Sequence, residues 1–240
     1  MRRGRKLAAA LAAALMMWTA AGCGARPSSA PSASASASAS ATSGASKAAV
    51  PSDSACGLPG SKDQTLSSAP EVDEWHHDSN NLWPWPSSKK YGPARTTSKG
   101  VRECFAHSPQ GAVFAAANIA AMWNNPDLMS DKSVILGLFG HGSQYDRLKT
   151  KLAETSAPSM KTDEDVRATM AGVRLLDMHD GKAVVDLAYD GSSYGHRSIV
   201  SIVYRLVWDD GDWKLQCEKD PPVTSAVLAT LSGYLEWKEG

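Results

Sequence analysis

Apolar and polar residues follow a helical spacing in the first part of the folded region. Ser108-Pro109 supplies a capping Ser and a Pro for the first helical turn, ahead of an Ala-rich run that extends to Trp123. This run predicts a helix, and its many small side chains allow close backbone approach, so we expect it to lie deep against a sheet. Shorter helices are expected over residues 130–139 and 143–154, and a last one over residues 223–231.

After residue 165 the hydrophobic period changes to two, which predicts β-strands. Strands are expected over residues 173–178, 183–189, 197–208 and 213–217, with Asp-Gly pairs at two of the turns. Such an antiparallel meander is buried on one face and partly wet on the other. Helices followed by a meander predict the α+β class.

The order of these elements also resembles a known fold. The helix block, the long hairpin and the turn Trp208-Asp-Asp-Gly-Asp-Trp213-Lys resemble the nuclear-transport-factor-2-like cone, in which N-terminal helices pack on a curved antiparallel sheet. The resemblance implies a cone domain over residues 105–240. Enzymes of this fold use an Asp or His in the cavity as a general base, so Asp177, Asp186 and Tyr204 are the candidate cavity residues. Their alternative interpretation is a set of cross-strand polar pairs on the wet face.

Residues 56–104 are rich in prolines, which break helices and remove sheet donors, and they carry Trp75, Trp83 and Trp85. We expect an extended strap that wraps over the domain and is pinned by its Trp rings. The alternative is an exposed platform in which Trp83 and Trp85 stack on cell-wall glycan.

The first 55 residues have the composition of an export signal followed by a tether. Residues 1–22 combine a cationic start with an Ala-rich apolar run, which is typical of a signal peptide. Ala20-Ala21-Gly22-Cys23 resembles a bacterial lipobox, and the resemblance implies a diacylglycerol on the Cys23 thiol and an anchor in membrane lipid. Residues 23–55 are rich in Ser and Ala and are expected to form a flexible tether. The expected location is the outer face of the cytoplasmic membrane, in the cell-wall zone; the alternative is plain secretion.

Composition excludes several classes of protein. The chain has 240 residues with 25 Lys+Arg and 25 Asp+Glu, but four of the basic residues lie in the expected signal peptide. The mature chain therefore carries 21 basic against 25 acidic residues, a net charge of −4, which argues against a nucleic-acid partner. No apolar run of roughly 18 or more residues follows the N-terminus, so a polytopic membrane protein is excluded.

With Cys23 acylated, Cys56, Cys104 and Cys217 remain in an oxidising compartment, where one disulfide and one free thiol are expected. Cys217 lies on the inward face of a predicted strand, so we expect it to pair with Cys56. The alternative is a bridge between Cys104 and Cys217. The cysteine spacing fits no zinc site, and we expect neither a metal nor a cofactor.

A second resemblance covers nearly the whole mature domain. Cys56-Gly-Leu-Pro-Gly60, the segment Phe105-Ala-His-Ser-Pro-Gln-Gly-Ala-Val113 and the ending Gly233-Tyr-x-x-Trp237 resemble those of a family of actinobacterial exported proteins and lipoproteins. Its members are often associated with integrative, conjugative-type elements, and their fold is similar to that of extracytoplasmic scaffold domains of type IV secretion systems. Cys104 departs from the family, which has an apolar or small residue there, and this supports leaving Cys104 unpaired. The resemblance implies location and fold more than activity.

We find no catalytic motif in the sequence. Ser143 lacks the second glycine of a nucleophile elbow, and the adjacent His76 and His77 have no identifiable third metal ligand. We therefore predict a non-enzymatic, membrane-anchored lipoprotein that acts as a protein-interaction module, with an envelope protein of a conjugative or secretion-type apparatus as its partner. Two alternatives stay open: a small-molecule binder or isomerase-like enzyme that uses the cone cavity, and cell-wall glycan binding.

Overall fold

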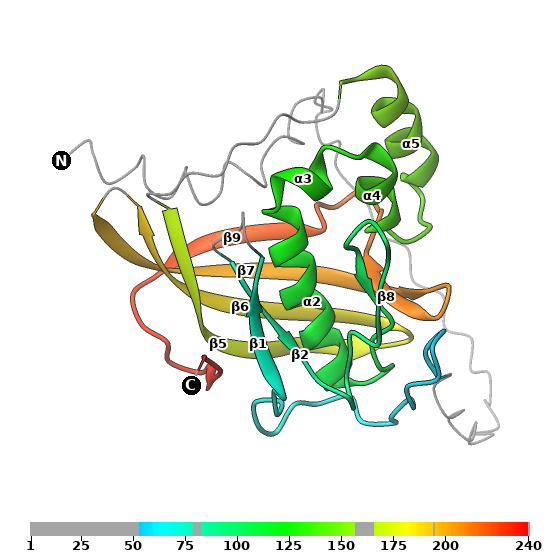
Figure 1. Ribbon diagram of the computed structural model, residues 1–240. Coiled ribbons are helices and arrows are strands. Elements are labelled where there is room, and N and C mark those ends of the chain that lie inside the picture. The colour runs from blue at the N-terminus through cyan, green and yellow to red at the C-terminus, as the bar shows by residue number, and fades with distance from the viewer. Residues whose placement is uncertain (1–52, 79–82, 157–165, 194, 240) are drawn as a thin grey trace, which may run out of the picture.

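An antiparallel sheet forms the larger part of the described structure. The computed structural model describes residues 53–78, 83–156, 166–193 and 195–239. The main sheet has the strand order β10-β5-β6-β7-β8, with β9 also paired to β7 (Figure 1). Its six strands are β5 (Val166–His179), β6 (Lys182–Ser193), β7 (His196–Asp209), β8 (Asp212–Leu215), β9 (Val223–Leu228) and β10 (Leu235–Glu236).

The alternation of apolar residues decides which face of β6 and β7 is buried. The buried residues of the two strands lie opposite one another, at Val185↔Tyr204, Leu187↔Ile202 and Tyr189↔Val200. We call this side the inner face of the sheet, and the side that carries Asp186 and Asp190 the outer face. The inward faces predicted for these two strands are thereby confirmed.

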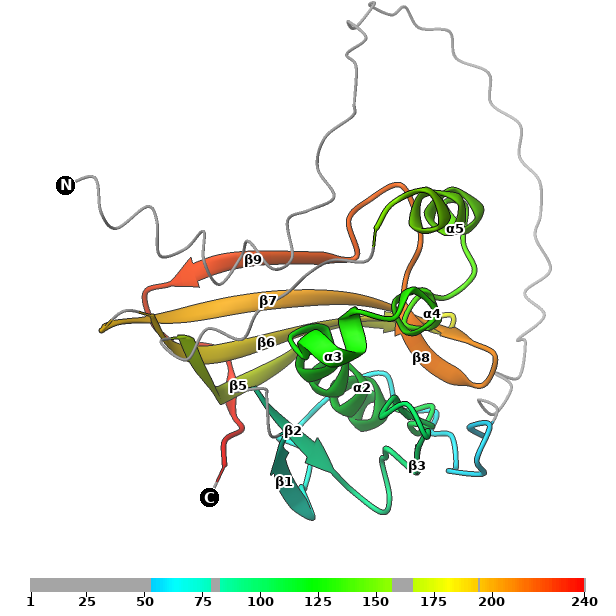
Figure 2. The same ribbon diagram turned by 45° about the horizontal axis from the view of Figure 1, so that its top comes forward.

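Helix α2 (Pro109–Trp123) is buried along almost its whole length. It lies between the inner face of the sheet and a hairpin of β1 (Glu74–His77) and β2 (Pro84–Ser87) (Figure 2). The predicted cap is confirmed, since the Ser108 hydroxyl accepts the Gly111 N–H at 3.0 Å. Gly111 leaves no room for a side chain, because a Cβ there would lie 1.9 Å from a backbone carbonyl oxygen. Gly111 therefore lets the first turn of α2 pack closely against Ala106 in the segment that precedes it.

Three short helices follow α2, and each packs on the next: α3 (Pro126–Met129), α4 (Lys132–Gly137) and α5 (Tyr145–Glu154). The helix expected over residues 130–139 is therefore shorter than predicted, since Asp131 caps α4.

Two further strands, β3 (Arg95–Thr96) and β4 (Arg102–Glu103), pair in a small separate sheet. Within the described ranges, no helix combines the length and the apolar character needed to cross a membrane.

The expected nuclear-transport-factor-2-like cone is wrong, and the α+β class holds only loosely. The six-stranded sheet dominates, and among the described helices α2 alone makes extended contact with it, whereas α3 to α5 lead away from α2. The β1–β2 hairpin explains the difference. It also reaches the inner face of the sheet beside α2, where β2 contacts β5 and Trp83 packs on Tyr189, and so it fills the place that further helices of a layer would need.

The helix expected at residues 223–231 is also wrong. Val223–Leu228 forms β9, which pairs with Ile199–Tyr204 of β7 without a bulge. Three of its six residues are β-branched and favour an extended backbone. The long β7 offers an edge to pair with, because β8 covers only its later part, from Leu206 to Asp209.

The disulfide joins Cys56 to Cys104, and Cys217 is buried and free. The expected bridge between Cys56 and Cys217 is therefore wrong, and so is the alternative between Cys104 and Cys217. Cys217 does lie on the inward side, as predicted, with 7% of its surface exposed. Burial raises the pKa of its thiol, which keeps Cys217 protonated at neutral pH.

Backbone contacts around Asp212 explain the observed pairing. The Asp212 carboxylate accepts the backbone N–H of Cys104 at 2.7 Å and that of Phe105 at 2.9 Å. The Ala55 N–H donates to the Gly211 carbonyl at 2.9 Å, one residue earlier in the same turn. Both segments thus meet at the β7–β8 turn, and this brings Cys56 to Cys104.

An ion pair that the sequence did not predict joins two parts of the strap, and Asn125 ties it to the segment after α2. The Asp78 carboxylate lies 3.2 Å from Arg102 Nη1 and accepts hydrogen bonds from Trp85 Nε1 and Asn125 Nδ2, each at 3.0 Å. The Arg102 side chain is 4% exposed, and its guanidinium lies 4.4 Å from the centre of the Trp85 ring. Burial opposes ionisation of Asp78, but the Arg102 charge and the hydrogen bonds outweigh it and lower the pKa of the carboxyl.

Replacing both Cys56 and Cys104 with Ser should lower the free energy of unfolding by about 4 kcal/mol, as expected for opening a loop of roughly 50 residues. Urea denaturation of the two proteins measures the difference. Alkylation of the denatured, unreduced wild-type protein should label Cys217 and neither of the other two cysteines. Labelling of Cys104 with protection of Cys217 would contradict the pairing.

Asp78→Asn should reduce stability at neutral pH, because it leaves the buried Arg102 charge without a carboxylate. Since the folded-state pKa of Asp78 is lowered, its contribution is present above the unfolded value and is lost as the pH falls through the folded value. Urea titrations between pH 7 and about pH 2 should therefore show the two proteins converging in acid. A constant difference across this range would show that the Asp78 charge does not stabilise the fold.

Candidate functional site

The outer face of the sheet carries the polar side chains that alternation keeps away from α2. On β6 these include Asp186 and Asp190. Asp186 is only 1% exposed although it is an acid. Burial of a charge is unfavourable unless the charge is paired and hydrogen-bonded, so the partners of Asp186 define the centre of the candidate site.

Three side chains from three different segments donate hydrogen bonds to Asp186. Arg174 lies directly opposite it on β5 and donates through Nη2 to Oδ2 at 2.6 Å. The Tyr234 hydroxyl donates to the same oxygen at 2.7 Å, and the Ser201 hydroxyl of β7 donates to Oδ1 at 2.7 Å. The Arg174 guanidinium also lies 4.0 Å from the centre of the Tyr234 ring. Hydrogen bonding to Asp186 raises the pKa of Arg174, and burial raises the pKa of Tyr234, so both stay protonated at neutral pH.

Tyr234 reaches Asp186 because the chain crosses the outer face near its C-terminus. β9 pairs with β7, whereas β10 pairs with β5 at Gly172 and Val173. Residues 229–234, which we call the C-terminal crossover, therefore pass over β6 between the two. The hydrogen bonds of Asp186 hold this crossover against the sheet.

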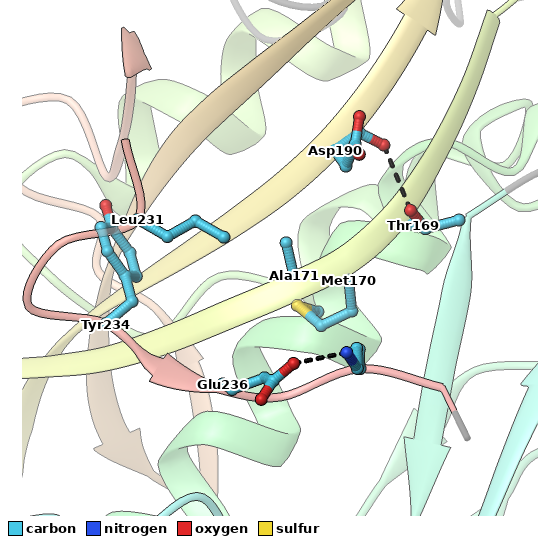
Figure 3. A pocket seen from close by; sticks show the side chains of 8 residues that line it. Thr169, Met170, Ala171, Asp190, Leu231, Tyr234 and Glu236 are labelled. Carbon is cyan, nitrogen blue, oxygen red and sulfur yellow. Dashed lines mark hydrogen bonds and ion pairs between the residues drawn. The ribbon is translucent and has the colours of Figure 1, made fainter. Parts of the chain in front are cut away.

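A hollow of about 390 Å³ lies beside this network, between the outer face and the C-terminal segment (Figure 3). Leu231 and Tyr234 of the crossover form one wall, and Glu236 lies across β5 from them in this view. The residues that line the hollow are Thr169, Met170, Ala171, Asp190, Leu231, Tyr234, Glu236 and Lys238.

The charged groups of the hollow are paired with near neighbours. Asp190 Oδ2 lies 2.6 Å from Arg197 Nη2, and Glu236 pairs with Lys238. The Thr169 hydroxyl donates to the Asp190 carbonyl at 3.3 Å. Ion pairs therefore border the hollow beside the apolar Leu231.

The three predicted cavity residues do not share a cavity. Asp186 lies in the network on the outer face. Tyr204 is buried in the core on the inner face, and this burial raises the pKa of its hydroxyl. Asp177 is exposed near the β5–β6 turn, with Oδ2 2.9 Å from His179 Nδ1. The alternative interpretation of cross-strand polar pairs describes Asp186 and Arg174 well. Tyr234 was missed because its partner lies 48 residues away in sequence.

Neither Trp of the alternative glycan platform presents an open ring face for stacking. Trp83 is 6% exposed and packs edge-on against Tyr189, with ring centres 4.7 Å apart. Trp85 is half-buried and stacks on His76 at 4.0 Å, in addition to its contact with Arg102. These contacts anchor the strap.

One cluster on the described surface has the ligand types for a metal ion: His141, Asp209 and Asp210 offer atoms that lie within 4.8 Å of one another. His141 Nδ1 lies 2.8 Å from Asp209 Oδ2, and Lys214 Nζ lies 3.3 Å from Asp210 Oδ2. The ammonium group of Lys214 already supplies the positive charge that a cation would bring. His76 and His77 bind separately, to Ser87 and Glu239.

The chain matches a domain of unknown function (DUF8175) over residues 34–236, which is most of its length. It therefore belongs to this family. No curated protein and no solved structure matches the chain.

Asp186→Ala should destabilise the fold by about 3 kcal/mol, because it leaves the charge of Arg174 and two hydroxyls without their acceptor. Asp177→Ala removes an exposed carboxylate from the same sheet and should change stability by less than about 1 kcal/mol. Urea denaturation of both variants provides the measurement. Equal effects would show that the network does not hold the crossover in place.

Proposed function

We propose that this member of the DUF8175 family is an exported lipoprotein, anchored through an acylated Cys23 to the outer face of the cytoplasmic membrane. In this proposal residues 1–22 are removed as a signal peptide, and residues 23–55 tether the sheet domain within the cell-wall zone. The sheet domain binds a protein partner of the envelope and has no catalytic role.

The observation that carries the proposal is the disulfide between Cys56 and Cys104. Structural disulfides persist in oxidising compartments and are rare in the cytosol, so this bridge supports export. It lies at the point where the Ser- and Ala-rich segment reaches the sheet domain. A tether that ends in a covalent link is well suited to an anchored protein, because the first turns of the domain cannot fray.

Binding is favoured over catalysis by the state of the polar groups. The buried carboxylate of Asp186 is occupied by three donors, and the charged groups of the hollow are each paired with a neighbouring side chain. The enzyme alternative depends on a cone cavity, and in this fold the corresponding inner face is filled by buried side chains such as Leu187, Tyr189 and Ile202. The resemblance to exported proteins linked to conjugative elements suggests an envelope-spanning transfer apparatus as the source of the partner.

Mass spectrometry of the protein expressed in a bacterial host that processes lipoproteins should find Cys23 as the N-terminal residue, carrying a diacylglycerol. The protein should then sediment with membranes, because each buried CH₂ contributes about 0.8 kcal/mol to anchoring. Cys23→Ser should lose the lipid and the processing that depends on it.

Cys217→Ala is the matched control, since it removes a thiol that takes no part in anchoring. It should keep the lipid and the membrane fractionation of the wild type. An unmodified N-terminus at another residue in the wild-type protein would end the lipoprotein proposal.

A further inference from the structure

β5 is paired along its whole length on one side and only briefly on the other. β6 pairs with it from Val166 to His179, whereas β10 covers only Gly172 and Val173. The backbone N–H of the next residue, Trp237, donates to the Ala171 carbonyl at 3.5 Å, and its ring turns inward, 4% exposed, against Trp75 and Phe114. Among the described residues, no strand pairs with the stretch from Arg167 to Met170 on the β10 side.

The hollow opens along this unpaired edge. Its lining includes three consecutive residues of β5, namely Thr169, Met170 and Ala171 (Figure 3). Successive side chains of a strand point to opposite faces, so three in a row can border one hollow only where it runs along the strand edge. Ala171 is the extra residue of a β-bulge between Met170 and Gly172, which bends β5 at the end of the unpaired stretch.

An open strand edge presents alternating N–H and C=O groups, and another extended polypeptide is the ligand that matches them. The hollow beside the edge then receives side chains of that polypeptide. Leu231 and the ring of Tyr234 offer apolar contact, and the volume of about 390 Å³ can hold large apolar side chains.

Charge at this edge selects the chemistry of the partner. Arg167, Ser192 and Arg197 lie in register across β5, β6 and β7 on the outer face. Arg197 is paired with Asp190, whereas Arg167 is exposed and has no ion-pair partner within the part of the chain that the structure describes. An acidic side chain on an added strand, directly opposite Arg167, would complete the row.

We propose that the edge of β5 from Arg167 to Met170 binds an extended acidic segment of a partner polypeptide, which adds to the sheet beyond the C-terminal segment and places an apolar side chain against Leu231 and Tyr234. This names the contact surface of the interaction module and rests on the proposed function. Among the described strands, β9 also has an edge with no partner, but its six residues carry no charge that would select a binding partner.

The experiment is selection of a random peptide library displayed on phage against the immobilised full chain. Enriched peptides should alternate acidic and apolar residues. Isothermal titration of a synthetic enriched peptide should show binding about tenfold weaker to Arg167→Glu than to the wild type, as expected for reversal of one interfacial charge. Arg147→Glu, an exposed charge reversal on α5, is the matched control and should bind normally.

The backbone contact is tested with the same peptide carrying N-methyl groups at alternate positions. Methylation in one register should abolish binding, because it removes the N–H groups that face β5, and the other register should be tolerated. This measurement does not require a protein variant to fold.

Three results would overturn the proposal: no enrichment of acidic peptides, tolerance of N-methyl groups in both registers, or loss of binding in Thr224→Glu on β9 with binding retained in Arg167→Glu. Each of these is distinguishable from failure of the proposed function, because the lipid on Cys23 is measured independently of peptide binding.

Discussion

The remaining structure depends on the hydrogen bonds that the Asp212 carboxylate accepts. It accepts the N–H groups of Cys104, Phe105 and Trp213, and burial nevertheless raises its pKa, because those hydrogen bonds only partly offset the loss of water. Cys104 is held there at a positive φ of 70°, a conformation that a non-glycine residue keeps only when its surroundings fix it. The disulfide then ties Cys56 to the same point. The position of α2 follows, since its capping Ser lies only four residues after Cys104.

A second set of contacts closes the fold at its other end. Trp237 donates from Nε1 to the Pro70 carbonyl at 2.9 Å and packs against Trp75, so the C-terminal segment lies beneath the strap. Asp186 holds the crossover that leads to it. The strap and the C-terminal segment therefore stabilise each other, although neither is long enough to form a layer of its own. Among the described strands of the main sheet, β5 and β9 each keep an edge that is largely unpaired.

Elements with a strong local signal could be predicted from the sequence. The Ser-Pro start of α2 and the alternation of β6 and β7 each depend on neighbouring residues, and each is found in place. The disulfide could not be deduced, because three cysteines allow three pairings. The observed pairing depends on the hydrogen bond from Cys104 to Asp212, which lies more than 100 residues later in the sequence. β9 was mistaken for a helix, since a short apolar segment fits either period and only the free edge of β7 decides. The hollow had no sequence signal, because its walls come from β5, β6 and the C-terminal segment.

In the proposed function, stability and binding are coupled at Tyr234. Its hydroxyl caps the buried Asp186, and its ring forms a wall of the hollow, so the network that fixes the crossover also fixes the shape of the hollow. The buried Asp186 and the stacked guanidinium of Arg174 hold Tyr234 in one rotamer, so Tyr234 presents a rigid surface. A rigid surface loses little conformational entropy when a ligand binds. The buried charge at Asp186 is difficult to explain as a source of stability alone, since a buried ion pair often contributes no more than an apolar replacement. The hydrogen bond to Tyr234 gives Asp186 a second role. It holds Tyr234 and the C-terminal crossover beside the unpaired stretch of the β5 edge.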